Sequence, residues 1–278
     1  MVFQVKTISD QQYFHLITLF LIFREWNRFL DFLHDTIKYN FSQTGFCPLY
    51  NFPPPRPDWQ ARGDGMRIPN HIGIIPDGNR RWAKGAGMEK QAGYAHGLAP
   101  GVKLLELARD AGVKELTYYG FTADNCRRPA AQVAAFSEAC VQAVGRIAEQ
   151  PVSLLVAGDG ASPFFPAPLR PYLTRTDFNG GGIRVNFLVN YGWEWDLDGL
   201  DRPGASRSRI LDSLRTRDIS RVDLVIRWGG MRRLSGFLPV QSVYADFFVV
   251  DRLWPDFQPG DFQQALDWYQ KQDVTLGG

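Results

Sequence analysis

Short apolar runs alternate with longer amphipathic segments from residue 68 onward, and this alternation predicts strands separated by helices. The run 71–75 carries three isoleucines and no acidic or strongly basic residue, which is typical of a strand buried on both faces of a parallel sheet. Strands joined by helices imply crossover connections. The pattern therefore predicts an α/β fold with a mainly parallel six-stranded sheet flanked by helices, with strands at 71–75, 115–121, 152–156, 183–190, 222–226 and 246–250.

Two of the connecting segments have helical periodicity. Residues 91–110 predict one helix, which Pro100 is expected to kink or restart because proline has no N–H to donate. Residues 130–148 predict a second helix that begins directly after a proline. In contrast, residues 202–221 are rich in arginine and lack a strong apolar period, so we expect a mobile connection there.

The first 65 residues differ from the rest of the chain. Their apolar run 13–23 is too short to span a bilayer and has no signal-peptide character. The wider pattern predicts an amphipathic helix over about 10–39, followed by a stiff proline-rich linker at 51–57. The helix is expected to pack on the body of the protein, with peripheral membrane contact or a protein partner as alternatives. We therefore divide the chain into an N-terminal extension, 1–65, and a main domain, 66–278.

Composition narrows the functional classes. A formal charge of +2 over 278 residues gives no support for binding to nucleic acid. Cys47, Cys126 and Cys140 show no metal-ligand or disulfide spacing, which favours a reducing, cytoplasmic location. The chain has no Walker-type loop and no GxGxxG after a strand, so nucleotide-binding folds receive little support.

Polar and basic residues follow the strands of the predicted sheet. Asp77 comes directly after the first strand, where open α/β sheets place their ligands. Its carboxylate could hold Mg²⁺, and guanidinium groups match the geometry of phosphate. Further polar groups follow the second and fifth strands. The residues gathered in this way are Asp77, Gly78, Asn79, Arg80, Arg81, Asn125, Arg128, Arg227, Arg233 and Ser235.

These segments together resemble the cis-prenyltransferases, the undecaprenyl and dehydrodolichyl diphosphate synthase family. The resemblance covers about residues 68–257 and rests on HIGIIPDGNRRWAK, FTADNCRRP, VNYG, VDLVIRWGG and YADFFVVDRLWPDF, which occur in the family's order. It implies the cis-prenyltransferase fold, Mg²⁺ as the cofactor and a homodimer. The implied reaction condenses an allylic prenyl diphosphate with isopentenyl diphosphate to give a Z-configured product.

The resemblance also implies roles for particular residues. Asp246 stands where the family has a glutamate, one methylene longer, that joins the metal site. The implied catalytic residues are Asp77, Asn79 and Asn125, and the implied Mg²⁺ ligands are Asp77 and Asp246. The allylic diphosphate is assigned to Gly78, Asn79, Arg80, Arg81, Lys90 and Arg128, and the isopentenyl diphosphate to Arg227, Arg233 and Ser235.

The chain departs from the family pattern at several positions. Tyr94 replaces a common histidine, with His96 two residues further on, and Met231 replaces a common acidic residue. The family's terminal Arg-x-Gly is absent from the last residues, 275–278. These departures leave two alternatives open: an atypical enzyme that makes short-chain or irregular products or acts as a terpene synthase, and a non-catalytic partner subunit. Asp77 argues against the second, because such subunits lack the metal-binding aspartate.

Overall fold

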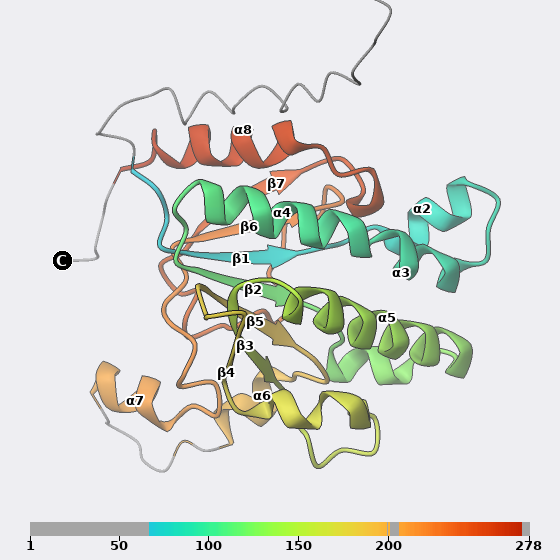
Figure 1. Ribbon diagram of the computed structural model, residues 1–278, viewed down its shortest axis with the longest axis horizontal. Helices are drawn as coiled ribbons and strands as arrows, with labels where there is room; N and C mark the ends of the chain where they lie inside the picture. Colours follow the sequence, from blue (N-terminus) through green and yellow to red (C-terminus); the bar gives the residue numbers. More distant parts are fainter. Residues whose placement is uncertain (1–66, 199, 201–205, 274–278) are drawn as a thin grey trace, which may run out of the picture. The chain divides into compact units, whose positions relative to one another are not determined.

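The computed structural model describes residues 67–198, 200 and 206–273. Their centre is a seven-stranded sheet in the order β4-β3-β5-β2-β1-β6-β7 (Figure 1). Every neighbouring pair is parallel except β3 with β4. The strands are β1 (His71–Ile75), β2 (Glu115–Tyr119), β3 (Val152–Ala157), β4 (Thr176–Phe178), β5 (Ile183–Leu188), β6 (Leu224–Trp228) and β7 (Asp246–Val250).

The six predicted strands are all present, and the mainly parallel α/β sheet is confirmed. The structure adds β4, which the sequence did not predict. This strand has only three residues and contains two polar ones, so it has no apolar run. It forms at the edge of the sheet because β3 supplies an antiparallel hydrogen-bonding partner.

Helices connect the strands, and one further helix, α8, follows the last strand. They are α2 (Asn79–Gly85), α3 (Gly93–His96), α4 (Leu98–Asp110), α5 (Ala130–Ala148), α6 (Trp193–Leu197), α7 (Arg207–Ser213) and α8 (Pro259–Tyr269). The predicted helix 130–148 is confirmed as α5. The predicted helix 91–110 is interrupted at Gly97, and Pro100 lies in the first turn of α4, where no N–H partner is required.

The segment 202–221 was expected to be a mobile connection, and for its central part this is wrong. Residues 207–213 form α7, and the Ser206 hydroxyl accepts a hydrogen bond from the Arg209 N–H at 3.5 Å. A polar N-cap stabilises such a short helix without an apolar stripe. The N-terminal extension, its linker and the last residues of the chain lie outside the described residues, as does the predicted boundary at residue 65.

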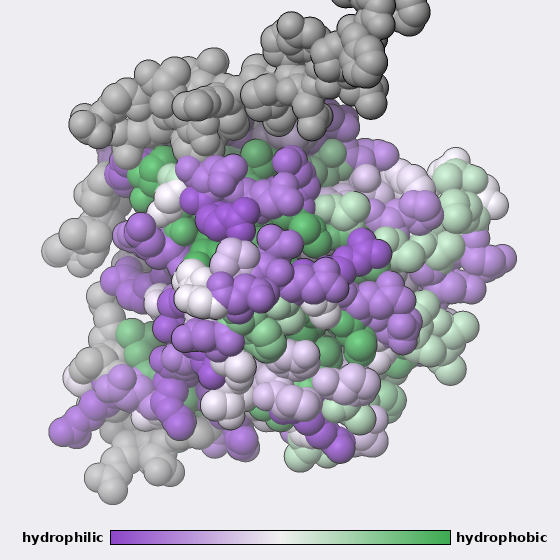
Figure 2. All heavy atoms as spheres, in the orientation of Figure 1, coloured by the Kyte–Doolittle hydropathy of each residue, from purple (hydrophilic) through white to green (hydrophobic). Residues whose placement is uncertain are grey.

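Two apolar layers cover the sheet. On one face α4, α5 and α8 contribute Leu104, Val144 and Phe262 to the larger core. On the other face the loops around β6 contribute Phe237 and Leu238. Figure 2 shows hydrophilic residues over the outer surface of α4 and hydrophobic ones between α4 and α5, as expected of amphipathic helices. With both faces covered, ligands have access to the sheet at its ends.

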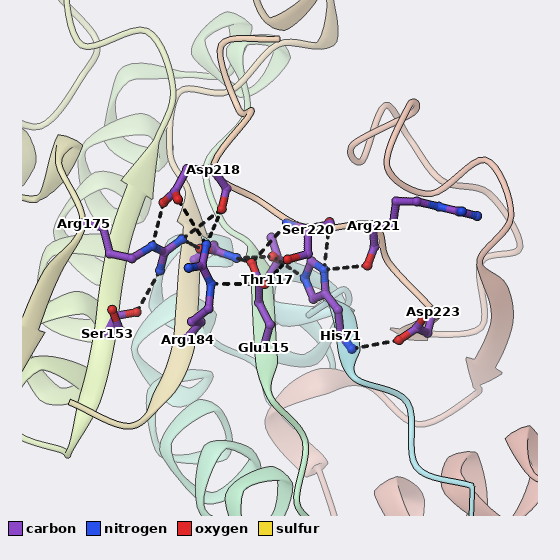
Figure 3. A network of polar contacts seen from close by, with 11 residues as sticks. His71, Glu115, Thr117, Ser153, Arg175, Arg184, Asp218, Ser220, Arg221 and Asp223 are labelled. Carbon is purple, nitrogen blue, oxygen red and sulfur yellow. Dashed lines mark hydrogen bonds and ion pairs between the residues drawn. The ribbon is translucent and has the colours of Figure 1, made fainter. Parts of the chain in front are cut away.

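A polar network lies at the amino-terminal ends of the central strands (Figure 3). The His71 ring contacts the Thr117 hydroxyl at 2.8 Å through Nε2 and the Ser220 carbonyl at 3.0 Å through Nδ1. Glu115 accepts hydrogen bonds from the Asn186 amide and the Ser220 hydroxyl. Because these buried groups satisfy one another, this end of the sheet is a structural junction.

This network predicts a stability that depends on pH. Burial lowers the pKa of His71 below its ordinary value, although the nearby Glu115 carboxylate opposes the shift. Below about pH 6.5 the His71 side chain therefore binds a proton in the unfolded chain but not in the folded chain. The free energy of unfolding consequently falls as the pH falls. We expect the free energy of unfolding to decrease between pH 7 and pH 5 by at most about 1.4 kcal/mol per pH unit from this group.

The measurement is denaturant unfolding of the full chain across that pH range. His71→Gln should flatten the dependence, whereas His96→Gln, which removes an exposed histidine, should leave it unchanged. Equal slopes in the wild type and His71→Gln would contradict the expectation.

Candidate active site

The turn after β1 presents Asp77 at the carboxyl-terminal edge of the sheet. The Asp77 N–H donates to the Ile75 carbonyl at 2.9 Å, and Gly78 then takes a positive φ of 113° before α2 begins. A side chain at Gly78 would be strained by this φ and would also meet Leu253 at 2.9 Å. The glycine thus lets the chain reverse closely enough to hold Asp77 beside the start of α2.

Arg227 on β6 lies next to Asp77 because β1 and β6 pair in register, with Ile75 opposite Arg227. Its Nη2 donates to the Asp77 Oδ2 at 2.7 Å, and its Nη1 donates to the Ser235 hydroxyl at 2.9 Å and to the Arg233 carbonyl. The Arg227 side chain is 5% exposed and that of Asp77 is 33% exposed. A largely desolvated cation is therefore fixed at the mouth of the sheet.

Arg81 approaches the same carboxylate from α2. Its Nη2 lies 3.5 Å from the Asp77 Oδ1 and donates to the Gly229 carbonyl at 2.8 Å. Gly229 has a φ of 86°, and a Cβ there would lie 2.4 Å from this guanidinium. The two arginines thus contact both oxygens of Asp77.

The loop after β6 is tied to the centre of the sheet. Tyr119, at the end of β2, donates its hydroxyl to the Ser235 carbonyl at 2.7 Å. Burial raises the pKa of Tyr119, with Asp124 adding to the shift and Arg227 opposing it. The phenol therefore stays protonated and keeps the loop in place over the physiological pH range.

These groups surround a polar cavity of about 580 Å³. All of the predicted site residues except Asp246 line it, so the structure brings them together at one edge of the sheet; their roles remain predictions. The predicted residues in the lining are Asp77, Gly78, Asn79, Arg80, Arg81, Lys90, Asn125, Arg128, Arg227, Arg233 and Ser235.

The structure corrects the predicted role of Asp246 as a metal ligand. It opens β7 and pairs in register with Leu224, which in turn pairs with Ile72 near the start of β1. Asp77 follows the end of β1, so the two carboxylates lie at opposite ends of parallel strands. The prediction that Asp77 and Asp246 hold one ion is therefore wrong within a single chain. The resemblance assigned Asp246 to the metal site, although the predicted strand 246–250 begins at this residue.

The lining also contains residues that the sequence prediction left out. Lys84 lies one helical turn beyond Arg80 on α2, a spacing that could have identified it. Tyr94 and Met231, noted only as departures from the family, both line the cavity. His96 is exposed, lies 4.5 Å from the Trp82 ring and lines neither this cavity nor its neighbour.

An apolar cavity of about 70 Å³ adjoins the polar one. It extends between α4 and α5, and Tyr118, Ile147 and Phe187 contribute to its wall. The Tyr118 and Phe187 rings stack with centroids 5.0 Å apart, and the Tyr118 hydroxyl donates to the Gly101 carbonyl at 2.8 Å. Both cavities share the lining residues Pro76, Asn79, Tyr94, Gly120 and Phe136.

The side chains that line the polar cavity can be compared with the ligands that Mg²⁺ takes in proteins. The described residues contain no group of three or more His, Cys, Asp or Glu side chains placed to bind a metal. The polar cavity offers the partly exposed carboxylate of Asp77 beside many cations. Because Mg²⁺ commonly binds one or two carboxylates together with substrate phosphates, this set fits an ion that is completed by a diphosphate.

The fold and the cavities together define the class: an α/β protein with a cation-rich cavity at the carboxyl edge of its sheet and an apolar cavity beside it. Residues 75–277 match the family model for undecaprenyl diphosphate synthase, a prenyltransferase family. The chain therefore belongs to the undecaprenyl diphosphate synthase family of prenyltransferases. This confirms the resemblance seen in the sequence.

Curated relatives and a solved structure agree with this membership. The chain is 33% identical over 228 residues to a ditrans,polycis-undecaprenyl-diphosphate synthase of Buchnera aphidicola, covering 75% of this chain and 91% of that protein. It is 34% identical over 229 residues to the enzyme of the same name from Pectobacterium atrosepticum, covering 76% and 90%. Lavandulyl diphosphate synthase from Lavandula x intermedia, solved with dimethylallyl diphosphate, has the same fold, with a TM-score of 0.66, 24% identity and coverage of 76% and 98%.

Proposed function

We propose that the protein condenses an allylic prenyl diphosphate with isopentenyl diphosphate to give a Z-configured prenyl or polyprenyl diphosphate. The observation that carries this proposal is the junction of two unlike cavities: one is rich in cations and the other is apolar, and they share five lining residues. A prenyl diphosphate has the same division into a charged head and a hydrocarbon tail. The scissile allylic bond would then lie where the cavities meet.

The residues suit the electrostatic demands of this reaction. Arg80, Arg81, Lys90 and Arg128 would neutralise the departing diphosphate, whose negative charge grows as the allylic bond breaks. Arg227, Arg233 and Ser235 would bind the diphosphate of isopentenyl diphosphate. The apolar wall would keep water away from the allylic cation, which water would otherwise capture.

We propose Mg²⁺ as the metal, held by Asp77 and the substrate's phosphate oxygens. When bound, the ion supplies positive charge that stabilises the leaving diphosphate. Asn79 and Asn125 are the proposed polar groups beside the reacting centre; the Asn79 Nδ2 donates to the Pro76 carbonyl at 3.0 Å, and Asn125 closes a capping box with Thr122. Both amides are thereby fixed in orientation.

The cellular location and the oligomeric state of the enzyme are also proposals. The described cysteines, Cys126 and Cys140, are free thiols, which supports a reducing cytoplasmic location. No described helix is long and apolar enough to cross a bilayer. We propose a homodimer in which residues 1–65 form an extension to the catalytic domain, with peripheral membrane contact as a further role for its amphipathic segment.

The test is a product assay with purified protein and Mg²⁺. Labelled dimethylallyl, geranyl, farnesyl and geranylgeranyl diphosphates are each incubated with and without isopentenyl diphosphate, and the labelled products are separated by chain length. Elongation that requires isopentenyl diphosphate supports the proposal. Turnover that depends only on a second added protein would instead support the role of a partner subunit.

A second candidate is the synthesis of short-chain or irregular products, and the size of the apolar cavity favours it. At about 70 Å³ this cavity is well below the roughly 300–1,000 Å³ of ordinary small-molecule sites. Met231 also places an uncharged side chain in the polar cavity where the family commonly has an acid. The same assay distinguishes the candidates, because products of one or two condensations, or products formed without isopentenyl diphosphate, would support the atypical reactions.

A further inference from the structure

Tyr94 occupies the boundary between the polar and the apolar cavity. It lies in α3, lines both cavities and is 5% exposed. Its neighbours in the buried cluster are Leu98 on α4 and Ala139 on α5. The side chain therefore presents its ring and its hydroxyl to two different environments.

The ring of Tyr94 is held by an aromatic contact. It stacks on Phe136 of α5, with the centroids 4.4 Å apart and the planes within 1° of each other. Phe136 in turn packs edge-on against Phe121 at 5.4 Å. Because Phe136 also lines both cavities, the stacked pair forms a rigid neck between them.

The hydroxyl of Tyr94 is held by a cation of the polar cavity. Arg128 Nη1 donates to it at 3.0 Å, so the phenol acts as an acceptor and its own hydrogen stays available for donation. Arg128 follows the short helical turn after β2, where its backbone N–H donates to the Asn125 carbonyl at 3.1 Å. Tyr94 thus holds the guanidinium of Arg128, while the turn after β2 holds the Arg128 backbone.

We propose that Tyr94 is a positioning and specificity residue. Its hydroxyl aims Arg128 at the allylic diphosphate, and its ring narrows the neck so that short allylic chains are favoured over long ones. The inference rests on the proposed function and deepens it, because it assigns the choice of allylic substrate to one side chain. The two parts of the side chain make separable contributions that can be removed one at a time.

The experiment compares Tyr94→Phe with Tyr94→Leu. Tyr94→Phe removes only the hydroxyl, so the KM for dimethylallyl diphosphate and the Kd for inorganic diphosphate should each rise about fivefold. The ratio of kcat/KM for farnesyl over dimethylallyl diphosphate should stay at the wild-type value. Tyr94→Leu also removes the ring, so this ratio should increase about fivefold or more and the products should lengthen.

His96→Leu is the matched control. This residue is on the same short helix but is exposed and outside both linings, so its KM, Kd and product lengths should equal those of the wild type. Thermal unfolding of each variant identifies any loss of fold, and Tyr94→Phe keeps the stacked ring in any case.

The outcomes separate this inference from the proposed function. The role of Tyr94 alone would be overturned by three results together. The wild type elongates allylic diphosphates, Tyr94→Phe keeps the wild-type Kd for inorganic diphosphate, and Tyr94→Leu keeps the wild-type ratio of kcat/KM for farnesyl over dimethylallyl diphosphate. A wild type that neither binds inorganic diphosphate nor extends any allylic diphosphate would overturn both. The predicted split between the two variants would support the inference, since a merely structural role would affect both substrates equally.

Discussion

Asp77→Ala should lower kcat by at least about two orders of magnitude while the protein stays folded. Asp77 is partly exposed at the mouth of the sheet, so its loss removes little packing. It does remove the carboxylate proposed to hold Mg²⁺ and leaves Arg227 without its 2.7 Å partner. The measurement is steady-state condensation at saturating substrates, together with Mg²⁺ titration in the presence of inorganic diphosphate.

Asp124→Ala is the control for this prediction. Asp124 lines the same cavity, but its side chain is 85% exposed and its ion pair with Arg127 is long, at 3.8 Å. Such exposed pairs contribute little, so this variant should keep near-normal turnover. If Asp77→Ala were as active as Asp124→Ala, the metal-binding role of Asp77 would be refuted.

Arg227→Ala should raise the KM for isopentenyl diphosphate about 10- to 100-fold. A hydrogen bond to a charged group contributes roughly 1.5–3 kcal/mol, and each 1.4 kcal/mol is a factor of ten in affinity. The side chain also holds the Ser235 hydroxyl at 2.9 Å, so its removal loosens a second proposed contact to the same diphosphate. Separate KM values for the two substrates are the measurement.

Arg232→Ala is the matched control, because Arg232 is an exposed arginine on the loop that follows β6 and does not line the cavity. It should leave both KM values unchanged. Arg227→Ala should affect the isopentenyl substrate more than the allylic one. A larger effect on the allylic KM would show that the two diphosphates have been assigned to the wrong arginines.

The gathering of the site residues could be predicted because it depends only on strand direction. Asp77 and Arg227 each lie at or just beyond the end of a buried strand, and parallel strands end at the same edge of a sheet. The same rule excludes Asp246, because this residue opens its strand. β4 could not be predicted, since a polar three-residue edge strand exists only through its partner.

The sequence by itself determined the α/β class, the six main strands, the family and the edge where charged groups collect, because periodicity and strand direction are local properties of the chain. Only the tertiary structure decided that two arginines contact Asp77, that Tyr94 joins Arg128 to Phe136, and that the apolar cavity is small. These features depend on the packing of side chains from distant segments. Their separations of a few ångströms are fixed by the whole core and are not encoded in any single segment.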